Sequence, residues 1–455
     1  MAKIKKHQHQ HDKKAWLVSV DMGYGHQRAA HPLLKLAQDQ EIITANNYRG
    51  IPDFDKKLWQ QSRKFYEFIS RFKQLPVIGE PIWNFYDQLQ EIPSFYPKRD
   101  LSAMSLQVKQ IYKLIEHKQW GRHLIDKLAK DPKPIIASFF IPAFMAEAHG
   151  YPGEIYCLTT DTDINRAWAP KNPFTSKINY FASNNRVVER LKLYGVAPDK
   201  IFLTGFPLPG ENTGGLDLKI AKYDLAHRLK NLDPQLKHWQ RYKGLVKRYL
   251  DIDKLPVKSN HPLTLMFAVG GAGAQRAIGA DILHSLKEQI KKKEIKIFLV
   301  AGIHNHVSTY FREQALDAGL RQELKNKGVE IIFAGNKYDY FKKFNQALRV
   351  TDILWTKPSE LSFYSALGIP IIIAPPIGSQ EHFNRRWLRT IGSAVSQDNP
   401  KYANEWLLDW VNSGWFAEAA MEGFIEAPQF GTYNIEQIIN HRFDQVQGPD
   451  TLVQF

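Results

Sequence analysis

Several hallmarks of secreted and membrane-spanning proteins are missing from this sequence. Cys157 is the only cysteine among 455 residues, which excludes an intrachain disulfide and a cysteine-based zinc site and fits a reducing cytoplasm. No stretch approaches the roughly 18 uninterrupted apolar residues of a membrane-spanning helix. Residues 1–14 are rich in Lys, His and Gln and lack the apolar stretch of a secretory signal, so we expect a disordered tail there. These absences predict a cytoplasmic protein and leave attachment to a membrane surface open.

Negative charge is also scarce. The chain has 61 Lys and Arg against 46 Asp and Glu, a formal net charge of +15. This excess favours anionic partners, which include nucleic acid, acidic lipid headgroups and phosphorylated small molecules. No nucleic-acid-binding motif accompanies the charge, so nucleic acid is not expected as a partner. The apolar fraction of 44% and the charged fraction of 24% are typical of a folded protein rather than a disordered one.

Short apolar runs alternate with helical stretches twice along the chain. Strands are expected at residues 15–20, 134–139, 154–159, 178–182 and 200–204, and again at 263–268, 296–301, 329–334, 352–355 and 370–374. Between them, helices are expected at 27–38, 101–130 and 184–194. This alternation predicts an α/β protein with two Rossmann-like, doubly wound domains. The expected organisation is a tail (1–14), a first domain (15–209), a basic helical insertion or linker (210–262), a second domain (263–400) and C-terminal helices (401–455).

Two segments carry unusual amounts of positive charge. Residues 219–248 contain nine Lys and Arg against two acids, which is typical of a solvated helix face or of a partner-binding surface. Residues 56–96 combine apolar residues at helical spacing with lysines, arginines and then aromatics. The second pattern predicts either contact with an anionic membrane surface or an ordinary helix with aromatics in the core.

Two glycine-rich loops each follow an apolar strand and precede a helix. The first contains Gly23, Gly25 and His26, and the second contains Gly270, Gly271, Gly273, Ala274 and Gln275. In such loops, backbone amides approach an anion at a helix N-terminus. Neither loop matches the dinucleotide fingerprint, because Arg28 and Arg276 stand at the third glycine position, and neither matches the P-loop. One loop in each domain predicts a phosphorylated ligand held in a cleft between the domains.

Polar residues directly follow the expected strand 352–355. Lys357 is a candidate for binding phosphate, and Ser359 and Glu360 open the next helix. A carboxylate at this position is stabilised by the helix dipole and can accept two ribose hydroxyls. Helix capping alone is the alternative interpretation of Ser359 and Glu360.

A second polar group follows the expected strand 370–374. Gln380, Glu381 and Asn384 lie where open α/β sheets bind ligands, and they are candidates for reading sugar hydroxyls. Phe333, at the end of strand 329–334, is a candidate for stacking on a nucleotide base or, equally, for a place in the core.

At this point an ordered series of short motifs carries a family resemblance. It resembles the monogalactosyldiacylglycerol synthases and, in its first loop, the lipid-linked N-acetylglucosaminyltransferase of peptidoglycan synthesis. The motifs, in chain order, are VDMGYGHQRAA (20–30), TDINRAW (162–168), TGFP (204–207), TK (356–357), LGIPII (367–372) and GSQEHFN (378–384).

The resemblance implies a GT-B glycosyltransferase, with two Rossmann-like domains facing each other across a cleft. The second domain would bind a UDP-sugar and the first would receive the acceptor. Transfer would invert the anomeric centre without a metal, so the UDP-sugar is a co-substrate and no cofactor is expected. Lipid-using members are monotopic at the cytoplasmic face, which implies a peripheral position on the inner face of the plasma membrane. The sequence departs from the pattern at Glu360, which lies earlier than the family's ribose-facing acid, and Phe363 occupies roughly that acid's place.

The resemblance also implies candidate catalytic and acceptor residues. His26 matches the family's proposed general base, and an ordinary pKa of about 6.5 suits that task at pH 7. As the alternative, His26 caps the helix that follows it. Asp163 is the second catalytic candidate; it and Asp161 follow strand 154–159, where aspartates either orient a base, bind hydroxyls or make turns.

On the acceptor side we expect Gly23, Gly25, Asn165 and Arg166. The predicted enzyme is therefore a UDP-sugar-dependent hexosyltransferase with a lipid or amphiphilic acceptor. Two alternatives stay open: a GT-B transferase with a soluble acceptor, and a nonhydrolysing sugar-nucleotide epimerase. The epimerase would need extra cleft carboxylates for proton abstraction, which the sequence pattern does not identify.

Overall fold

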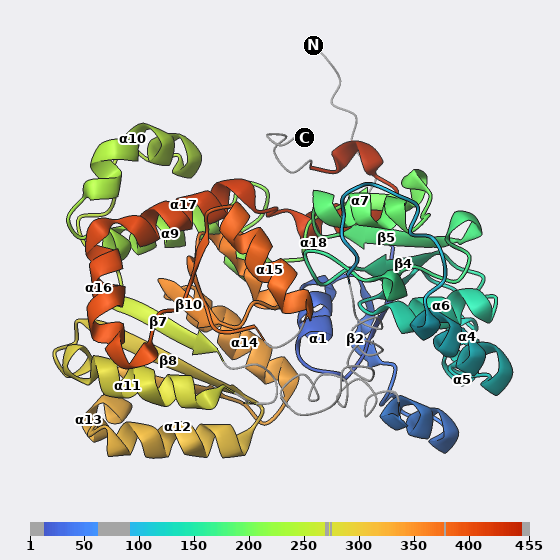
Figure 1. Ribbon diagram of the computed structural model, residues 1–455, viewed down its shortest axis with the longest axis horizontal. Helices are drawn as coiled ribbons and strands as arrows, with labels where there is room; N and C mark the ends of the chain where they lie inside the picture. The colour runs from blue at the N-terminus through green and yellow to red at the C-terminus, as the bar shows by residue number, and fades with distance from the viewer. Residues whose placement is uncertain (1–12, 62–91, 269–272, 274, 377–378, 448–455) are drawn as a thin grey trace, which may run out of the picture.

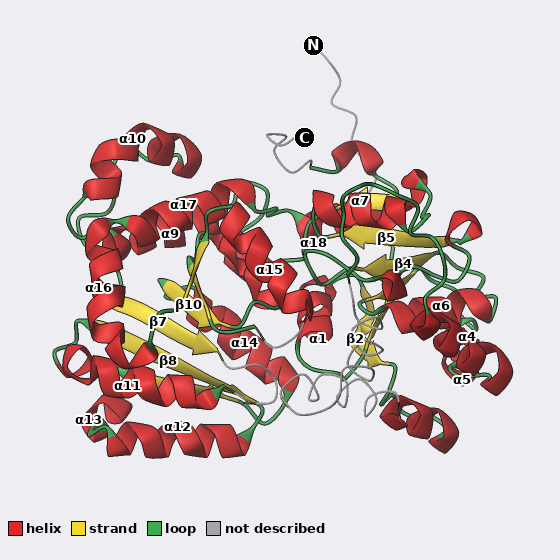
Figure 2. Cartoon of the chain, viewed as in Figure 1, coloured by secondary structure: helices red, strands yellow, loops and turns green. Residues whose placement is uncertain are grey.

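The computed structural model describes residues 13–61, 92–268, 273, 275–376 and 379–447, and they form two α/β domains (Figures 1 and 2). Each domain is built on a parallel sheet with helices on its faces. The predicted fold class is confirmed, because both sheets are doubly wound. In the part of the chain that the structure describes, no helix has the length and apolar character needed to cross a bilayer.

The first sheet has the strand order β2-β1-β3-β4-β5-β6. Its strands are β1 (Ala15–Ser19), β2 (Ala37–Thr44), β3 (Ile135–Ala137), β4 (Ile155–Leu158), β5 (Ile178–Ala182) and β6 (Ile201–Leu203). The central strands are apolar and almost fully buried, as strands covered on both faces must be. The order reverses between β1 and β3, so the first glycine loop leaves the sheet at its topological switch point.

The second sheet has the order β12-β11-β10-β7-β8-β9. Its strands are β7 (Leu263–Ala268), β8 (Ile295–Gly302), β9 (Val329–Phe333), β10 (Ile353–Thr356), β11 (Ile371–Ile373) and β12 (Ala394–Ser396). Here the order reverses between β7 and β10. Gly273 and Gln275 come shortly after β7 and Lys357 directly follows β10, so these residues belong to the switch point of this sheet.

Helices cover both sheets. In the first domain these are α1 (Gly25–Ala30), α4 (Leu106–Lys118), α5 (Arg122–Leu128), α6 (Phe140–Ala148) and α7 (Asn185–Leu193). In the second domain they are α11 (Arg276–Lys291), α12 (Asn305–Asp317), α13 (Arg321–Lys325), α14 (Lys337–Leu348), the 3₁₀ helix η5 (Glu360–Leu367) and α15 (Ser379–Thr390).

The segment between the domains and the C-terminal segment are helical. They form α8 (Gly210–Thr213), α9 (Lys219–Leu232), α10 (Lys237–Leu250), α16 (Ala403–Ser413), α17 (Trp415–Glu426) and α18 (Gly431–Ile439). Arg228 of α9 is buried and donates hydrogen bonds to the carbonyls of Thr351 and Leu367, which fastens α9 to the second domain. By contrast, α18 returns to the first domain, where Asn434 donates to the Thr204 carbonyl at 3.0 Å (Figure 1).

Three local expectations were wrong. Strands β2 and β12 were missed; β2 lies at the edge of its sheet and is half polar, so it lacks the apolar run of a central strand. The helix expected at 27–38 ends by residue 33, in a short 3₁₀ turn. The helix expected at 101–130 is two helices, because the chain turns at Gly121, whose φ of +83° suits glycine and whose missing Cβ leaves room for Met145.

Candidate functional site

The first glycine loop contacts the second domain. Tyr24 reaches across, and its hydroxyl accepts a hydrogen bond from the backbone N–H of Ile303, just after β8, at 3.0 Å. The neighbouring Gly302 makes this possible, because a Cβ there would lie 2.3 Å from the tyrosine oxygen. Asp21 of the same loop pairs with Lys337 of α14 at 2.5 Å. The loop that sequence analysis assigned to the cleft therefore does face the other domain, and α1 lies between the two sheets in Figure 1.

His26 sits at the switch point of the first sheet with one ring nitrogen committed. Its Nδ1 lies 2.8 Å from the carbonyl oxygen of Ser138, which directly follows β3. A carbonyl only accepts, so Nδ1 carries the proton in the neutral ring and Nε2 keeps its lone pair. Burial, partly offset by this bond, lowers the pKa of His26 to about 4. The ring is therefore neutral at pH 7, with Nε2 able to accept a proton.

Glu360 also lies at this interface, but it points to the first domain. Its carboxylate Oε1 is 3.3 Å from Nε of Arg28, on α1. Arg28 itself is buried inside the second domain, where its guanidinium donates to the Tyr340 hydroxyl at 2.8 Å and lies 4.2 Å from the centre of the Phe344 ring. Gly25 packs against the other oxygen of Glu360.

Asp161 is the functional candidate that sequence reasoning left in second place. Its carboxylate accepts a hydrogen bond from Nδ2 of Asn384 at 3.1 Å, across the two domains. Burial raises the pKa of Asp161 to about 6; the bond from Asn384 and the Lys357 charge act in the opposite direction, and the charges of Glu360 and Glu381 raise it further. Asp161 thus lies within a group of acids contributed by both domains.

The structure places Asp163, the second catalytic candidate, against two arginines. Its carboxylate is buried and receives hydrogen bonds from Arg190 at 2.8 and 2.9 Å and from Arg186 at 3.0 Å, both on α7. A carboxylate saturated in this way holds the first domain together and is not available to a base or an acceptor. The signal that could have revealed this is the pair of arginines four residues apart, which share one face of a helix.

Two acceptor-side candidates are also committed to the fold. Asn165 caps a short 3₁₀ helix by accepting from the Ala167 amide at 3.1 Å. Arg166 is buried, and its guanidinium donates to the carbonyls of Ser102, Ala169 and Pro170. Both side chains are therefore committed to the structure of the first domain. Of the four acceptor-side candidates, Gly23 and Gly25 belong to the loop that contacts the second domain. Gly23 is exposed and has a φ of +108°.

On the donor side, Lys357 and Glu381 form an ion pair at 2.5 Å between the β10 end and α15. Asn384, one turn further along α15, bridges to the first domain by accepting from both the amide and the hydroxyl of Thr162, at 2.9 and 2.8 Å. The structure thus brings Lys357, Glu381, Asn384 and Asp161 together. Gln380 precedes Glu381 and Asn384 on α15.

The remaining donor candidates are placed less centrally. Gly270, Gly271 and Ala274 lie outside the described residues, as does most of the basic stretch 56–96. Gly273 has a φ of +65°, and a Cβ there would meet Val307. Gln275 donates to the Pro375 carbonyl at 2.8 Å, which ties the β7 end to the β11 end.

Ser359 makes no side-chain cap to η5, so its predicted capping alternative is wrong. Phe333 ends the edge strand β9, partly buried against the second-domain core. Phe363, at the family's acidic position, stacks on Phe206 with ring centres 4.5 Å apart. Phe363 is thus part of the packing between the domains.

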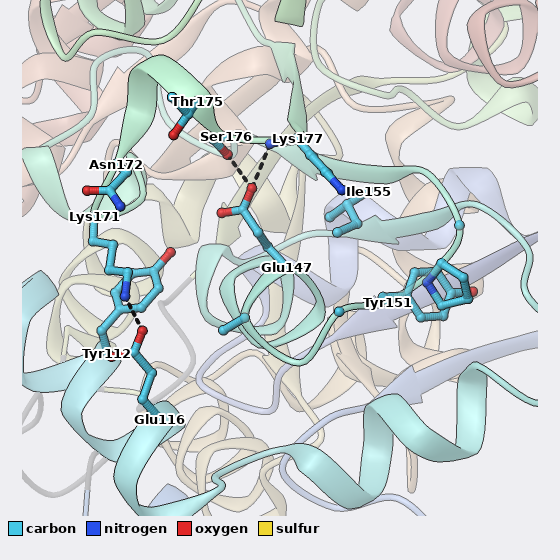
Figure 3. Close-up of a pocket in the computed structure, with 14 residues that line it drawn as sticks. Tyr112, Glu116, Glu147, Tyr151, Ile155, Lys171, Asn172, Thr175, Ser176 and Lys177 are labelled. Atoms are coloured by element: carbon cyan, nitrogen blue, oxygen red, sulfur yellow. Dashed lines mark hydrogen bonds and ion pairs between the residues drawn. The ribbon is translucent and has the colours of Figure 1, made fainter.

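Two further features bear on ligand binding. Across the described ranges, no three His, Cys, Asp or Glu side chains are arranged to hold a metal ion. A cavity of about 550 Å³ lies in the first domain, lined among others by Tyr112, Glu147, Lys171 and Lys177 (Figure 3). Its lining includes Ile155, the first residue of β4. The cavity therefore lies at the amino end of this strand, whereas the first glycine loop and Asp161 follow the carboxyl ends of their strands.

Comparison with known proteins adds sequence similarity over most of the chain. Residues 254–321 match a family model described as a domain of unknown function, DUF6938. Over 394 residues the chain is 21% identical to the processive diacylglycerol beta-glucosyltransferase of Bacillus pumilus, covering 84% of this chain and 83% of the relative.

Among solved structures, similarity extends to MurG of Acinetobacter baumannii, with a TM-score of 0.48 and 13% identity over 94% of this chain and 99% of that one. It also extends to the UDP-GlcNAc 2-epimerase of Neisseria meningitidis bound to UDP-GlcNAc, with a TM-score of 0.43 and 13% identity over 81% of this chain and 90% of that one. The glucosyltransferase similarity confirms the resemblance stated from the motifs, and its name agrees with the predicted enzyme class, a hexosyltransferase.

Proposed function

We propose that this protein is an inverting glycosyltransferase that moves a hexose from a UDP-sugar to a lipid or other amphiphilic acceptor. The observation that carries the proposal is His26. Its tautomer is fixed by the Ser138 carbonyl, its Nε2 is unprotonated at pH 7, and it stands where the first domain meets the second.

The second domain is proposed to hold the donor. As the glycosidic bond breaks, negative charge grows on the diphosphate, and donors that already point at those oxygens lower the barrier most. Lys357 directly follows β10, at the switch point of that sheet, and we propose that its ammonium binds the diphosphate together with amides of the second glycine loop. We expect the diphosphate to compete with Glu381 for Lys357, because Lys357 forms an ion pair with Glu381.

The first domain is proposed to activate the acceptor. Nε2 of His26 takes the proton of the acceptor hydroxyl while its oxygen attacks the anomeric carbon. The bond from that carbon to the phosphate oxygen breaks, and UDP leaves with the electron pair. A base placed in this way contributes about 10²–10⁴-fold to the rate.

The lipid acceptor is proposed from the sequence relative, whose name specifies diacylglycerol. With it comes the proposal of a cytoplasmic protein held peripherally at the inner face of the plasma membrane. The net charge of +15 supports attraction to an anionic surface. Flotation with acidic liposomes should retain the protein at low salt and release it as salt rises, because salt screens exposed charges. Failure to float at low salt favours a soluble acceptor instead.

One observation favours the epimerase as second candidate. Asp161, Glu360 and Glu381 provide the cleft carboxylates that such an enzyme would use for proton abstraction, and the sequence pattern had not identified them as a group. The two functions differ in what happens to UDP. A transferase releases it when acceptor is present, whereas an epimerase keeps the sugar nucleotide intact and exchanges a proton of the sugar with solvent.

The test has two steps. A melting-temperature panel of UDP, GDP and dTDP should favour UDP, since a ligand at 100 times its Kd stabilises by about 2.7 kcal/mol. UDP-glucose is then incubated with diacylglycerol in mixed micelles in D₂O. Release of UDP that needs the lipid, and that falls at least tenfold in His26→Gln with UDP affinity kept, supports the transferase. Deuterium in the recovered sugar nucleotide without UDP release supports the epimerase, and no melting shift with any nucleotide rejects both.

A further inference from the structure

We infer that Glu360 is the acid partner of His26: its carboxylate, contributed by the second domain, stabilises the imidazolium that forms when His26 takes the acceptor's proton. Arg28 acts as the positioning residue that holds this carboxylate. The inference rests on the proposed function and assigns Glu360 a role other than binding ribose.

The side chain of Glu360 crosses from one domain to the other. It begins η5, directly after β10, yet its carboxylate lies over the first turn of α1, the turn that carries His26. One oxygen is 3.3 Å from Nε of Arg28. The other is so close to Gly25 that a Cβ on that residue would lie 3.2 Å away. The absence of a side chain at Gly25 therefore lets the Glu360 carboxylate lie close to α1.

Arg28 fixes Glu360 because it is itself held by the second domain. Its side chain is 2% exposed, it donates to the Tyr340 hydroxyl, and it lies over the rings of Tyr340, Phe341 and Phe344. A guanidinium anchored by stacking and by a hydroxyl can offer Nε in one direction only. Glu360 consequently reaches its place only when the two domains are in contact.

The imidazolium needs such a partner because its surroundings are otherwise apolar. The His26 ring packs against Phe139 and lies within reach of Trp168. Burial lowers the pKa of His26 to about 4, and Glu360 is the side chain whose charge raises it again. The other groups that interact with Glu360 are Arg28, Tyr340, Tyr364 and Asp161.

This geometry disfavours a ribose role for Glu360. A nucleotide held at the switch point of the second sheet would need the carboxylate to turn back toward its own domain. Doing so would leave Arg28 buried without its carboxylate, and an unpaired buried charge costs about 3–5 kcal/mol. The shifted position of the acid relative to the family pattern is explained by its contact with α1.

The experiment compares Glu360→Gln, Glu360→Asp and the matched control Glu330→Gln, whose carboxylate pairs with Lys296 elsewhere in the second domain. Turnover of UDP-glucose, its KM and the Kd of UDP are measured for each. We expect Glu360→Gln to lower kcat about tenfold, corresponding to about one pKa unit of lost stabilisation, while the UDP Kd changes less than twofold. Glu360→Asp keeps the charge and should recover part of the rate. Glu330→Gln should behave as wild type.

A double-mutant cycle separates this role from a structural one. If Glu360 acts through His26, then Glu360→Gln adds nothing to the loss already caused by His26→Gln. An equal further loss in the double variant would overturn the inference, as would a tenfold rise in the UDP Kd of Glu360→Gln with kcat retained, which is the result expected of a ribose ligand.

A second readout needs no catalytic activity. Nuclear magnetic resonance of ¹⁵N-histidine-labelled protein follows the titration of His26, which should move to lower pH in Glu360→Gln and stay near the wild-type value in Glu360→Asp. An unchanged titration in Glu360→Gln overturns the inference. If wild type turns over no UDP-sugar, the proposed function fails and the titration still decides whether the two side chains are coupled. Should Glu360→Gln not fold, Glu360→Ala replaces it in both measurements, with the same changes expected in kcat and in the His26 titration.

Discussion

Replacing Asp161 by Asn should stabilise this protein at neutral pH, and the effect should vanish in acid. The carboxyl lies where the two domains meet and accepts one hydrogen bond from Asn384. Burial raises its pKa from 3.8 to about 6, so the folded state keeps a proton that the unfolded chain has already released. Between these two pH values the folded state binds more protons, and stability therefore falls as the pH rises.

The magnitude follows from the two pKa values. A shift of about two units corresponds to about 3 kcal/mol, and because the side chain keeps some contact with solvent we expect 1–3 kcal/mol, as an order of magnitude. Above pH 6 this cost is fully present. Asparagine has nearly the same shape, keeps the oxygen that accepts from Asn384 and carries no charge. Asp161→Asn should thus recover the cost, raising the melting temperature by roughly 2–4 °C for each kcal/mol.

Urea unfolding of wild type and Asp161→Asn at pH 7.5 and near pH 4 provides the assay. The variant should have the higher midpoint at pH 7.5 and an equal midpoint near pH 4. Asp163→Asn is the matched control, since that carboxylate is paired with Arg186 and Arg190. Removing its charge leaves a buried arginine unpaired and should cost about 3–5 kcal/mol at pH 7.5. The reasoning is refuted if Asp161→Asn is destabilising at pH 7.5, or if it stabilises equally at both pH values.

Three other predictions concern the contact between the domains. Asn384→Ala removes the acceptor of the Thr162 amide and hydroxyl and should cost about 2–4 kcal/mol, measured as a lower urea midpoint; no change would mean that this bridge is absent in solution. Gly302→Ala places a Cβ 2.3 Å from the Tyr24 oxygen at a φ of +65° and should lower the free energy of unfolding by about 1–3 kcal/mol. Tyr24→Phe removes one hydrogen bond and should lower it by roughly 1 kcal/mol, so equal losses in urea unfolding would contradict the close approach. The pKa of His26 is about 4 in the folded protein and 6.5 in the unfolded chain, so the unfolded chain binds more protons between these pH values. Acidification from pH 6.5 to 4 should therefore lower the free energy of unfolding of wild type by up to about 3 kcal/mol more than that of His26→Gln, measured by urea unfolding. Equal losses in the two proteins would contradict a buried neutral ring.

The sequence predicted the sheets well because most strands are buried on both faces and therefore read as continuous apolar runs. It failed for β2, whose polar residues face solvent at a sheet edge. The place of the first glycine loop was predictable for a related reason. Glycine marks a turn where another group approaches the backbone closely, and this turn follows a strand that was already recognised.

Side-chain roles were harder to predict because they depend on partners far away in the chain. Asp161 and Asp163 lie two residues apart in one loop, yet one faces Asn384 of the other domain and the other faces two arginines of α7. Nothing local distinguishes them. Glu360 likewise owes its position to Arg28, 332 residues earlier in the chain, and only the contact between the domains brings the two together.

The burial of Arg28 also has a consequence for how the chain is made. Its guanidinium belongs to the first helix of the protein, but the rings and the carboxylate that surround it lie between residues 340 and 360. At about 5–20 residues per second, a ribosome needs roughly 15–65 s to supply them. Throughout that interval the Arg28 side chain of the nascent first domain lacks the residues that bury it. It can be buried as in the finished protein only after the ribosome has supplied these residues of the second domain.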